Sequence, residues 1–165
     1  MSVRKILTWP DKRLRTAAAD VPAVTDEIRA IWRDMVETMD AMPGVGLAAP
    51  QIGVMLRLAV VDTSEARNKR ILLANPEVVD ASAIMNVHEE ASPCLSGVSA
   101  KVSRPRGVKV RYMDDSGAVV ERDFVGLDAT SVQHQIDHLA GKMYFDRLSK
   151  MKRDMLIKRA AKLNG

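Results

Sequence analysis

Two histidines, His134 and His138, lie four positions apart in the segment SVQHQIDHLAGKMYFD. On a helix, side chains with this spacing lie on one face, so both imidazoles could bind a single metal ion. The H-E-x-x-H signature of metal-dependent hydrolases has the same spacing, with a glutamate after the first histidine. Here Gln135 takes the place of that glutamate. The pattern predicts a metal site without its proton-transferring carboxylate, although two ordinary polar or core histidines would show the same spacing.

A metal held by two histidines needs a further protein ligand, because catalytic sites usually have three and leave one position to water. The candidates are Cys94, which is the only cysteine, and the nearby His88, Glu89 and Glu90. A single cysteine forms no intramolecular disulfide, which fits a reducing compartment and leaves the thiol free for a metal. Its alternative role is that of a small buried hydrophobic residue. Composition does not choose among these candidates.

Two other segments add a resemblance to a known family. GVGLAAPQIG (44–53) resembles the first signature of the peptide deformylases, CLS (94–96) is similar to the core of their second, and QHQIDHLAGKMYFDRL (133–148) resembles their third. The order and spacing agree, and the resemblance covers nearly the whole chain. It implies a metal-dependent hydrolase that removes the N-formyl group from the N-terminal formylmethionine of new polypeptides.

The resemblance also implies a role for each matching residue. Cys94, His134 and His138 would bind one divalent metal ion, Fe(2+) or Zn(2+), with water as the fourth ligand. The side-chain amide of Gln51 and the backbone N–H of Leu95 would face the formyl oxygen, where negative charge accumulates during hydrolysis.

A second group of residues would contact the peptide. Gly44, Val45 and Gly46 correspond to the loop that lines the substrate backbone, and their small size permits close approach. Lys101 stands where the family often has an arginine that touches substrate. A lysine keeps the charge but loses the planar fork of the guanidinium.

The chain departs from the family pattern at the position of the catalytic carboxylate. An amide such as that of Gln135 cannot accept and return a proton at neutral pH, and general acid–base catalysis typically contributes about 10²–10⁴-fold. Ser92 and Pro93 also replace the Glu-Gly pair that precedes the cysteine in the family. We hypothesise that Glu89 or Glu90 supplies the missing carboxylate. Two alternatives to a weak deformylase therefore stay open: an impaired homologue that binds N-terminal peptides or a partner, and a hydrolase of another small amide.

The elements that must position these residues follow from hydrophobic spacing. The apolar residues of 24–42 recur at helical intervals, with Thr25 as the N-cap and a stop at Pro43 and Gly44. A second helix is expected to begin near Asp128, a good cap, and to end at Gly141. Four strands are expected at 56–62, 70–80, 108–114 and 118–124, the last two joined as a hairpin by 114–117. A basic helix is expected at 150–163, with Met151, Met155, Leu156 and Leu163 on its apolar side. This order predicts one α+β domain over residues 1–165, with antiparallel or mixed β-sheets around the central metal-binding helix.

Composition and charge limit the partners. The chain has 165 residues, 47% hydrophobic and 28% charged, which is typical of a globular protein. No run approaches the ~20 apolar residues that cross a bilayer, and the polar N-terminus does not resemble a secretory signal, so we expect a cytoplasmic protein without a membrane partner. The formal charge of +4 is mild and gathers in the tail, so we expect no specific DNA binding. In the setting of the family, that tail would lie near the ribosomal exit.

Overall fold

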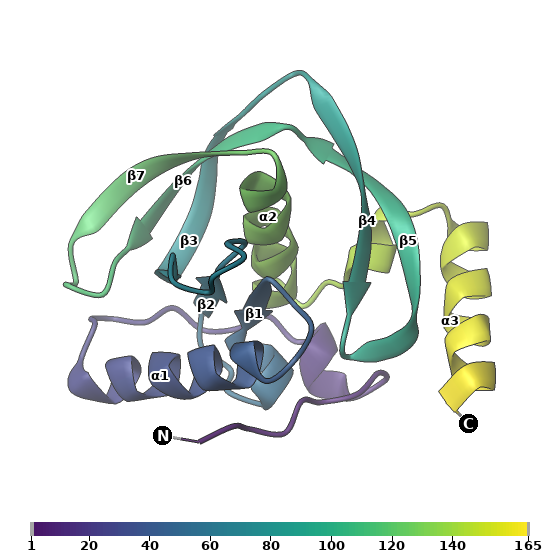
Figure 1. Cartoon of the computed structure of the whole chain (residues 1–165), viewed down its shortest axis with the longest axis horizontal. Helices are drawn as coiled ribbons and strands as arrows, with labels where there is room; N and C mark the ends of the chain where they lie inside the picture. Colours follow the sequence, from purple (N-terminus) through teal and green to yellow (C-terminus); the bar gives the residue numbers. More distant parts are fainter. Residues whose placement is uncertain (1, 165) are drawn as a thin grey trace.

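A central helix lies between a five-stranded sheet and a separate two-stranded ribbon in the computed structural model, which describes residues 2–164 (Figure 1). The three helices are α1 (Asp26–Asp40), α2 (Leu127–Leu139) and α3 (Lys150–Asn164). The strands are β1 (Gly46–Ala48), β2 (Leu58–Val61), β3 (Ile71–Ala81), β4 (Met85–Ser92), β5 (Leu95–Pro105), β6 (Gly107–Met113) and β7 (Val119–Val125). Three single turns of 3₁₀ helix lie at Lys12–Arg15, Ala49–Ile52 and Tyr144–Arg147.

The five-stranded sheet has the order β1-β2-β3-β6-β7, and every neighbouring pair is antiparallel. β4 and β5 pair only with each other and form what we call the β4–β5 ribbon. α2 packs against β1, β2 and β7 on one side and reaches β5 on the other, while α3 covers the outer side of β5 (Figure 1). The predicted α+β class with antiparallel sheets around a central helix is therefore confirmed.

The first helix forms where the sequence predicts it. The Thr25 side chain accepts a hydrogen bond from the backbone N–H of Ile28, at 3.3 Å, and so satisfies one of the free donors of the first turn. Trp32, Met35 and Met39 lie on one side of α1 and are buried against β1 and β2. Their burial fixes the helix beneath the sheet edge that carries the segment 42–46.

Three sequence-based details were wrong. α2 begins at Leu127, close to the predicted start, but its N-cap is Gly126 (φ 66°) and not Asp128, whose side chain accepts a hydrogen bond from Thr63. On α3, Leu156 is buried together with Ala160, whereas Met151, Met155 and Leu163 are exposed. β1, β4 and β5 were not predicted. No helix among residues 2–164 is both long and apolar enough to cross a bilayer.

Candidate active site

A cavity of about 400 Å³ lies between the first turns of α2, strand β4 and the segment before β1. Four separate parts of the chain line it: 42–46, Gln51, residues 89–93 and 96–98 of the β4–β5 ribbon, and Leu127, Thr130, Ser131, His134 and Gln135 of α2. Gly44, Val45, Gly46, Gln51, His134 and Gln135 are thus brought together as the sequence predicts. Cys94, Leu95 and His138 are buried close to this wall and do not line the cavity itself.

α2 carries the two histidines on one face, with ring centroids 5.0 Å apart. The Nδ1 atom of His134 lies 2.8 Å from Oε1 of Glu90. Because an ionised carboxylate can only accept, this bond places the hydrogen on Nδ1 and leaves Nε2 with a free lone pair. The Tyr144 ring stacks on the His134 ring, with the two ring centroids 5.8 Å apart. Burial raises the pKa of Tyr144 to about 12. His134 is therefore held in one tautomer and one orientation.

His138 lies one turn deeper and is 1% exposed. Neither ring nitrogen has a hydrogen-bond partner within the described part of the chain. Burial, with a smaller effect from His134, lowers the pKa of His138 well below its ordinary value of 6.5, so the imidazole is neutral. A buried imidazole without partners is rare in folded proteins, and its neutral form is the one that binds metals.

Cys94 lies in the turn between β4 and β5, directly before the first residue of β5, and is 2% exposed. Its Sγ atom is 3.5 Å from Nε2 of Gln51, while Oε1 of Gln51 accepts from the backbone N–H of Ala48 at 2.9 Å. The Gln51 amide is therefore fixed at both ends, with its N–H donors directed toward the cysteine. Burial raises the pKa of the Cys94 thiol, so a thiolate at this position requires a nearby cation.

The side chains of this site have the donor chemistry of a metal centre. Among residues 2–164, no three or more His, Cys, Asp or Glu side chains are already arranged as a group that could hold a metal ion. Three side chains nevertheless offer soft or borderline donors that suit zinc or iron(II). These donors are the unpartnered nitrogens of His138, the Nε2 atom of His134 and the buried thiol of Cys94. The residues therefore fit such an ion chemically.

Gln135 occupies the cavity wall next to His134 and is 5% exposed. Its Oε1 atom has no hydrogen-bond partner among the described residues. Gly46 approaches the amide so closely that an added Cβ would lie 2.4 Å from Nε2 of Gln135 and 2.7 Å from Oγ of Ser131. A side chain at position 46 would therefore have to displace the Gln135 amide and the Ser131 hydroxyl, both of which are buried.

Glu90 takes the position of a supporting carboxylate behind the histidine. Besides the bond to His134, it receives two bonds from Arg104, at 2.6 and 2.9 Å. Burial raises the pKa of Glu90, but the bonds from His134 and Arg104 outweigh this effect and hold the pKa below its ordinary value. The backbone reaches this arrangement through an irregular pairing between Glu90 and Ser92 near the end of β4.

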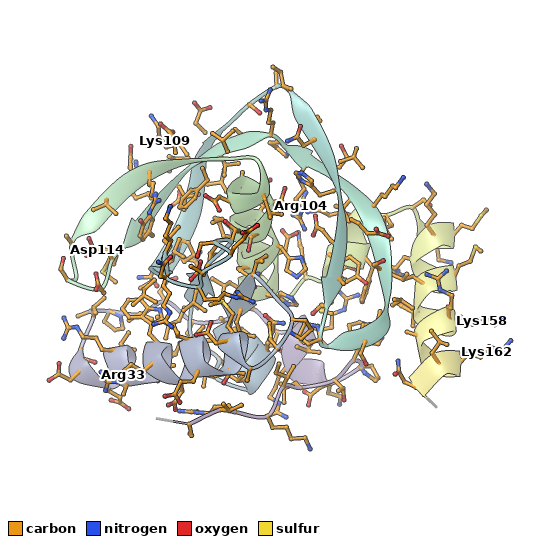
Figure 2. All side chains as sticks on the ribbon, viewed as in Figure 1. Arg33, Arg104, Lys109, Asp114, Lys158 and Lys162 are labelled. Atoms are coloured by element: carbon orange, nitrogen blue, oxygen red, sulfur yellow. The ribbon has the colours of Figure 1, made fainter. Side chains whose placement is uncertain are left out.

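Arg104 connects this carboxylate to a second one. It is 1% exposed, and its Nη1 atom lies 2.9 Å from Oδ2 of Asp137, which also receives two bonds from Arg147. Figure 2 shows Arg104 inside the molecule, between α2 and the β4–β5 ribbon. Sequence reasoning did not identify Arg104, because an arginine in a polar strand gives no sign of burial, nor Arg147, which lies in the 3₁₀ turn Tyr144–Arg147. The alternation of charged residues in β4 and β5 was the only available signal.

Two other residues lie away from the expected place or role. Lys101 is exposed and lines a different hollow, between β5 and α3. Glu89 is exposed, and its carboxylate accepts from Ser99 at 2.9 Å rather than approaching Gln135. The Leu95 side chain packs into the same core cluster as Val98, and the role expected for its backbone N–H stays a prediction.

Comparison with known proteins agrees with the motifs. The family model for polypeptide deformylase matches residues 3–154. The peptide deformylase of Afipia carboxidovorans is 43% identical over 98% of this chain and 96% of the relative, and that of Rhodopseudomonas palustris strain TIE-1 is 44% identical over 98% and 95%.

Solved structures give the same result. The peptide deformylase of Legionella pneumophila superimposes with a TM-score of 0.91 at 39% identity, covering 98% of this chain and 95% of that one. The Ehrlichia chaffeensis peptide deformylase in complex with actinonin gives 0.93 at 36% identity, with 99% of both chains covered. The family match, the relatives and the shared fold establish that this chain belongs to the peptide deformylase family.

Proposed function

We propose that this chain hydrolyses the N-formyl group of N-terminal formylmethionine on new polypeptides, giving formate and a free amine. One observation carries the proposal: a single cavity gathers the segment 42–46 and the nearby Gln51 with His134, from two distant parts of the chain. The relatives are named peptide deformylases over nearly the full length. A non-catalytic binding protein and a hydrolase of another amide are not favoured by these matches.

In this proposal Cys94, His134 and His138 hold one Fe(2+) or Zn(2+) ion. Such an ion, when bound, lowers the pKa of a water molecule and supplies the nucleophile at neutral pH. Glu90 keeps the His134 ring in the tautomer that offers Nε2, a kind of support that typically matters about 10–100-fold for metal affinity or activity. The Gln51 amide and the Leu95 N–H would donate to the formyl oxygen, and 44–46 would contact the peptide backbone.

Gln135 is the residue that limits the rate in this proposal. Its buried amide can orient a hydroxyl group or water by hydrogen bonds but cannot carry a proton from one group to another. Glu90 is committed to Arg104 and His134, and Glu89 lies at the exposed rim, so neither carboxylate faces Gln135 in a free state. The leaving amine therefore takes its proton without a carboxylate.

The test compares wild type with Gln135→Glu after anaerobic purification and metal analysis. Hydrolysis of a formyl-Met peptide should rise by about 10²–10⁴-fold in the variant, because a positioned carboxylate restores proton transfer. Gln133→Glu, on the same helix but directed at the Pro105 carbonyl, is the matched control and should bring no gain. A wild type that turns over at a rate which Gln135→Glu does not improve contradicts this role of Gln135. Absence of bound metal with Cys94 reduced contradicts the ligand assignment.

A contact with the ribosome through α3 is the second part of the proposal and agrees with a cytoplasmic location. Lys152, Lys158, Arg159 and Lys162 on α3 form no ion pair with an acidic side chain among residues 2–164, and Figure 2 shows Lys158 and Lys162 extending away from the molecule. Such unpaired charge attracts RNA phosphates in a salt-dependent way. Lys158→Glu combined with Lys162→Glu should abolish co-sedimentation with ribosomes at low salt, whereas Lys5→Glu with Lys12→Glu should not. Equal binding by both double variants contradicts the contact.

A further inference from the structure

Another hollow, of about 770 Å³, lies between α1 and the five-stranded sheet, and we call it the α1 hollow. Its wall is formed by one face of α1, the segment 70–72 at the start of β3, the end of β6 with the turn that follows, and Arg122 on β7. Figure 2 shows Arg33 and Asp114, which both line it, at the same end of the molecule. The α1 hollow and the cavity of the candidate active site share none of the described residues.

Two buried donors on the wall of the α1 hollow lack an acceptor. Trp32 is 1% exposed, and its Nε1–H has no hydrogen-bond partner among residues 2–164. Tyr112 is 6% exposed, and its hydroxyl is likewise unpaired within the part of the chain that the structure describes. Buried polar groups are nearly always hydrogen-bonded, so two such donors in one hollow indicate an acceptor that the chain itself does not supply.

The cations of the α1 hollow are all arginines, four in number among the described residues. Arg29 and Arg70 are each bonded to an aspartate of α1, at 2.9 Å. Arg33 and Arg122 form no ion pair with any residue of 2–164, and the Arg122 guanidinium lies over the Phe124 ring, 5.1 Å from its centroid. A guanidinium presents a planar fork of donors that matches a carboxylate. Two such forks are therefore available to a ligand.

Four carboxylates also line the α1 hollow, and they restrict the ligand to one compact negative charge. Two of them already accept hydrogen bonds, while the side chains of Glu37 and Asp115 form no ion pair with Arg33 or Arg122. A long polyanion such as nucleic acid would meet like charge along this wall. A single carboxylate near the two free guanidinium groups avoids most of that repulsion.

The rest of the wall is apolar. Val36, Ile71 and Leu72 line the α1 hollow beside the charged groups. Sites for small organic ligands typically have volumes of about 300–1,000 Å³ and combine apolar walls with a few polar groups. The size and lining of the α1 hollow match this class of site, and they suit a ligand that has an apolar part as well as a charge.

We propose that the α1 hollow binds a small organic carboxylate with an apolar body. Arg33 and Arg122 pair with the carboxylate, and the indole N–H of Trp32 and the hydroxyl of Tyr112 donate to its oxygens. The apolar body packs on the aliphatic side chains of the wall. This site is separate from the proposed deformylation, and its test needs no catalytic turnover.

The test uses benzoate as the probe, benzamide as its uncharged counterpart, and inorganic phosphate as an oxyanion without an apolar body. Nitrogen–proton correlation NMR of the full chain follows the indole N–H signals of the two tryptophans. Trp32→Phe assigns the Trp32 signal, and Trp9, which lies outside the α1 hollow, is the internal control. Kd is measured for wild type, Arg33→Gln and Arg122→Gln. Arg106→Gln is the matched control, because Arg106 is an exposed arginine without an ion pair among residues 2–164 and lies outside the α1 hollow.

Benzoate should shift the Trp32 signal to saturation and leave the other tryptophan signal in place. Benzamide should bind about tenfold more weakly, because it loses the charge-assisted bonds to the guanidinium groups. Arg33→Gln and Arg122→Gln should each weaken benzoate binding by about tenfold, and Arg106→Gln should leave it unchanged. Glu37→Gln should tighten binding by about twofold, because it removes a like charge from the wall.

Three results would overturn the inference. The first is a Trp32 signal that does not respond to benzoate. The second is equal binding of benzoate and benzamide, or an equal loss of affinity in Arg33→Gln and Arg106→Gln. The third is phosphate that binds as tightly as benzoate, because the apolar wall would then contribute nothing to recognition. Each of these results leaves the proposed deformylation untouched.

Discussion

Removal of the Glu90 charge should destabilise the protein more than any other single change on β4. In Glu90→Gln, the amide can accept one of the two Arg104 bonds, but its NH₂ group then faces another donor, on Arg104 or on His134. Arg104 and Glu90 expose only 1% and 4% of their side chains, so water cannot replace the lost acceptor. Breaking one partner of a buried ion pair typically costs about 3–5 kcal/mol.

For a chain of this size each kcal/mol shifts the melting temperature by about 2–4 °C, so the expected fall is ~6–20 °C. The assay is thermal unfolding at neutral pH, followed by circular dichroism, on variants in the same metal state. Glu89→Gln is the control, because Glu89 is exposed and bonds only to Ser99, and it should stay within about 0.5 kcal/mol of wild type. If Glu90→Gln melts no earlier than Glu89→Gln, the ion-pair network around Arg104 does not stabilise the fold as we infer.

Two further predictions concern packing and pH. Gly46→Ala should lower the melting temperature and weaken peptide binding, as measured by a binding titration, because the added Cβ would lie 2.4 Å from Nε2 of Gln135. Gly44→Ala is the control and should have a mild effect, because the nearest atom there is the flexible end of Met42. Asp146→Asn should destabilise the protein at pH 7. Burial raises the pKa of Asp146, but Arg15 and other partners outweigh burial and hold this pKa below the ordinary 3.8. The stability that the ionised Asp146 contributes is therefore fully present above pH 3.8 and is lost as the pH falls through the lower folded-state pKa. A melting difference that does not shrink as the pH falls below 3.8 would contradict the second prediction.

The parts of the fold that follow the usual apolar patterns could be predicted from the sequence. α1, β2, β3, β6 and β7 bury their apolar residues in the ordinary way, and their expected ranges differ from the observed ones by one or two residues. β4 was missed because its pattern is reversed. Its inward residues, such as Glu90 and Ser92, are polar, while Val87 on the opposite face is 62% exposed. A strand whose interior side is hydrophilic does not resemble a strand in a hydrophobicity pattern.

The residues of the candidate site that belong to sequence motifs could be predicted, but the ion-pair network that supports them could not. The motif positions Gln51, His134 and Gln135 do line one cavity. The buried guanidinium of Arg104 could not be expected, since its burial depends on Glu90 and Asp137 arriving from two other elements. Pairings of this kind depend on three-dimensional contacts that no local pattern records.

The irregular pairing near the end of β4 has a consequence for comparing members of this family. By its resemblance to the family, the chain carries Ser92 where a glutamate is expected, so a position-by-position comparison would score the supporting carboxylate as lost. In space, Glu90 fills that role from two residues upstream, in contact with His134. Two chains can therefore keep the same electrostatic support for a histidine while sharing no acidic column in their alignment. Classification of such homologues as active or inactive should count carboxylates by the atom they touch and not by the column they occupy.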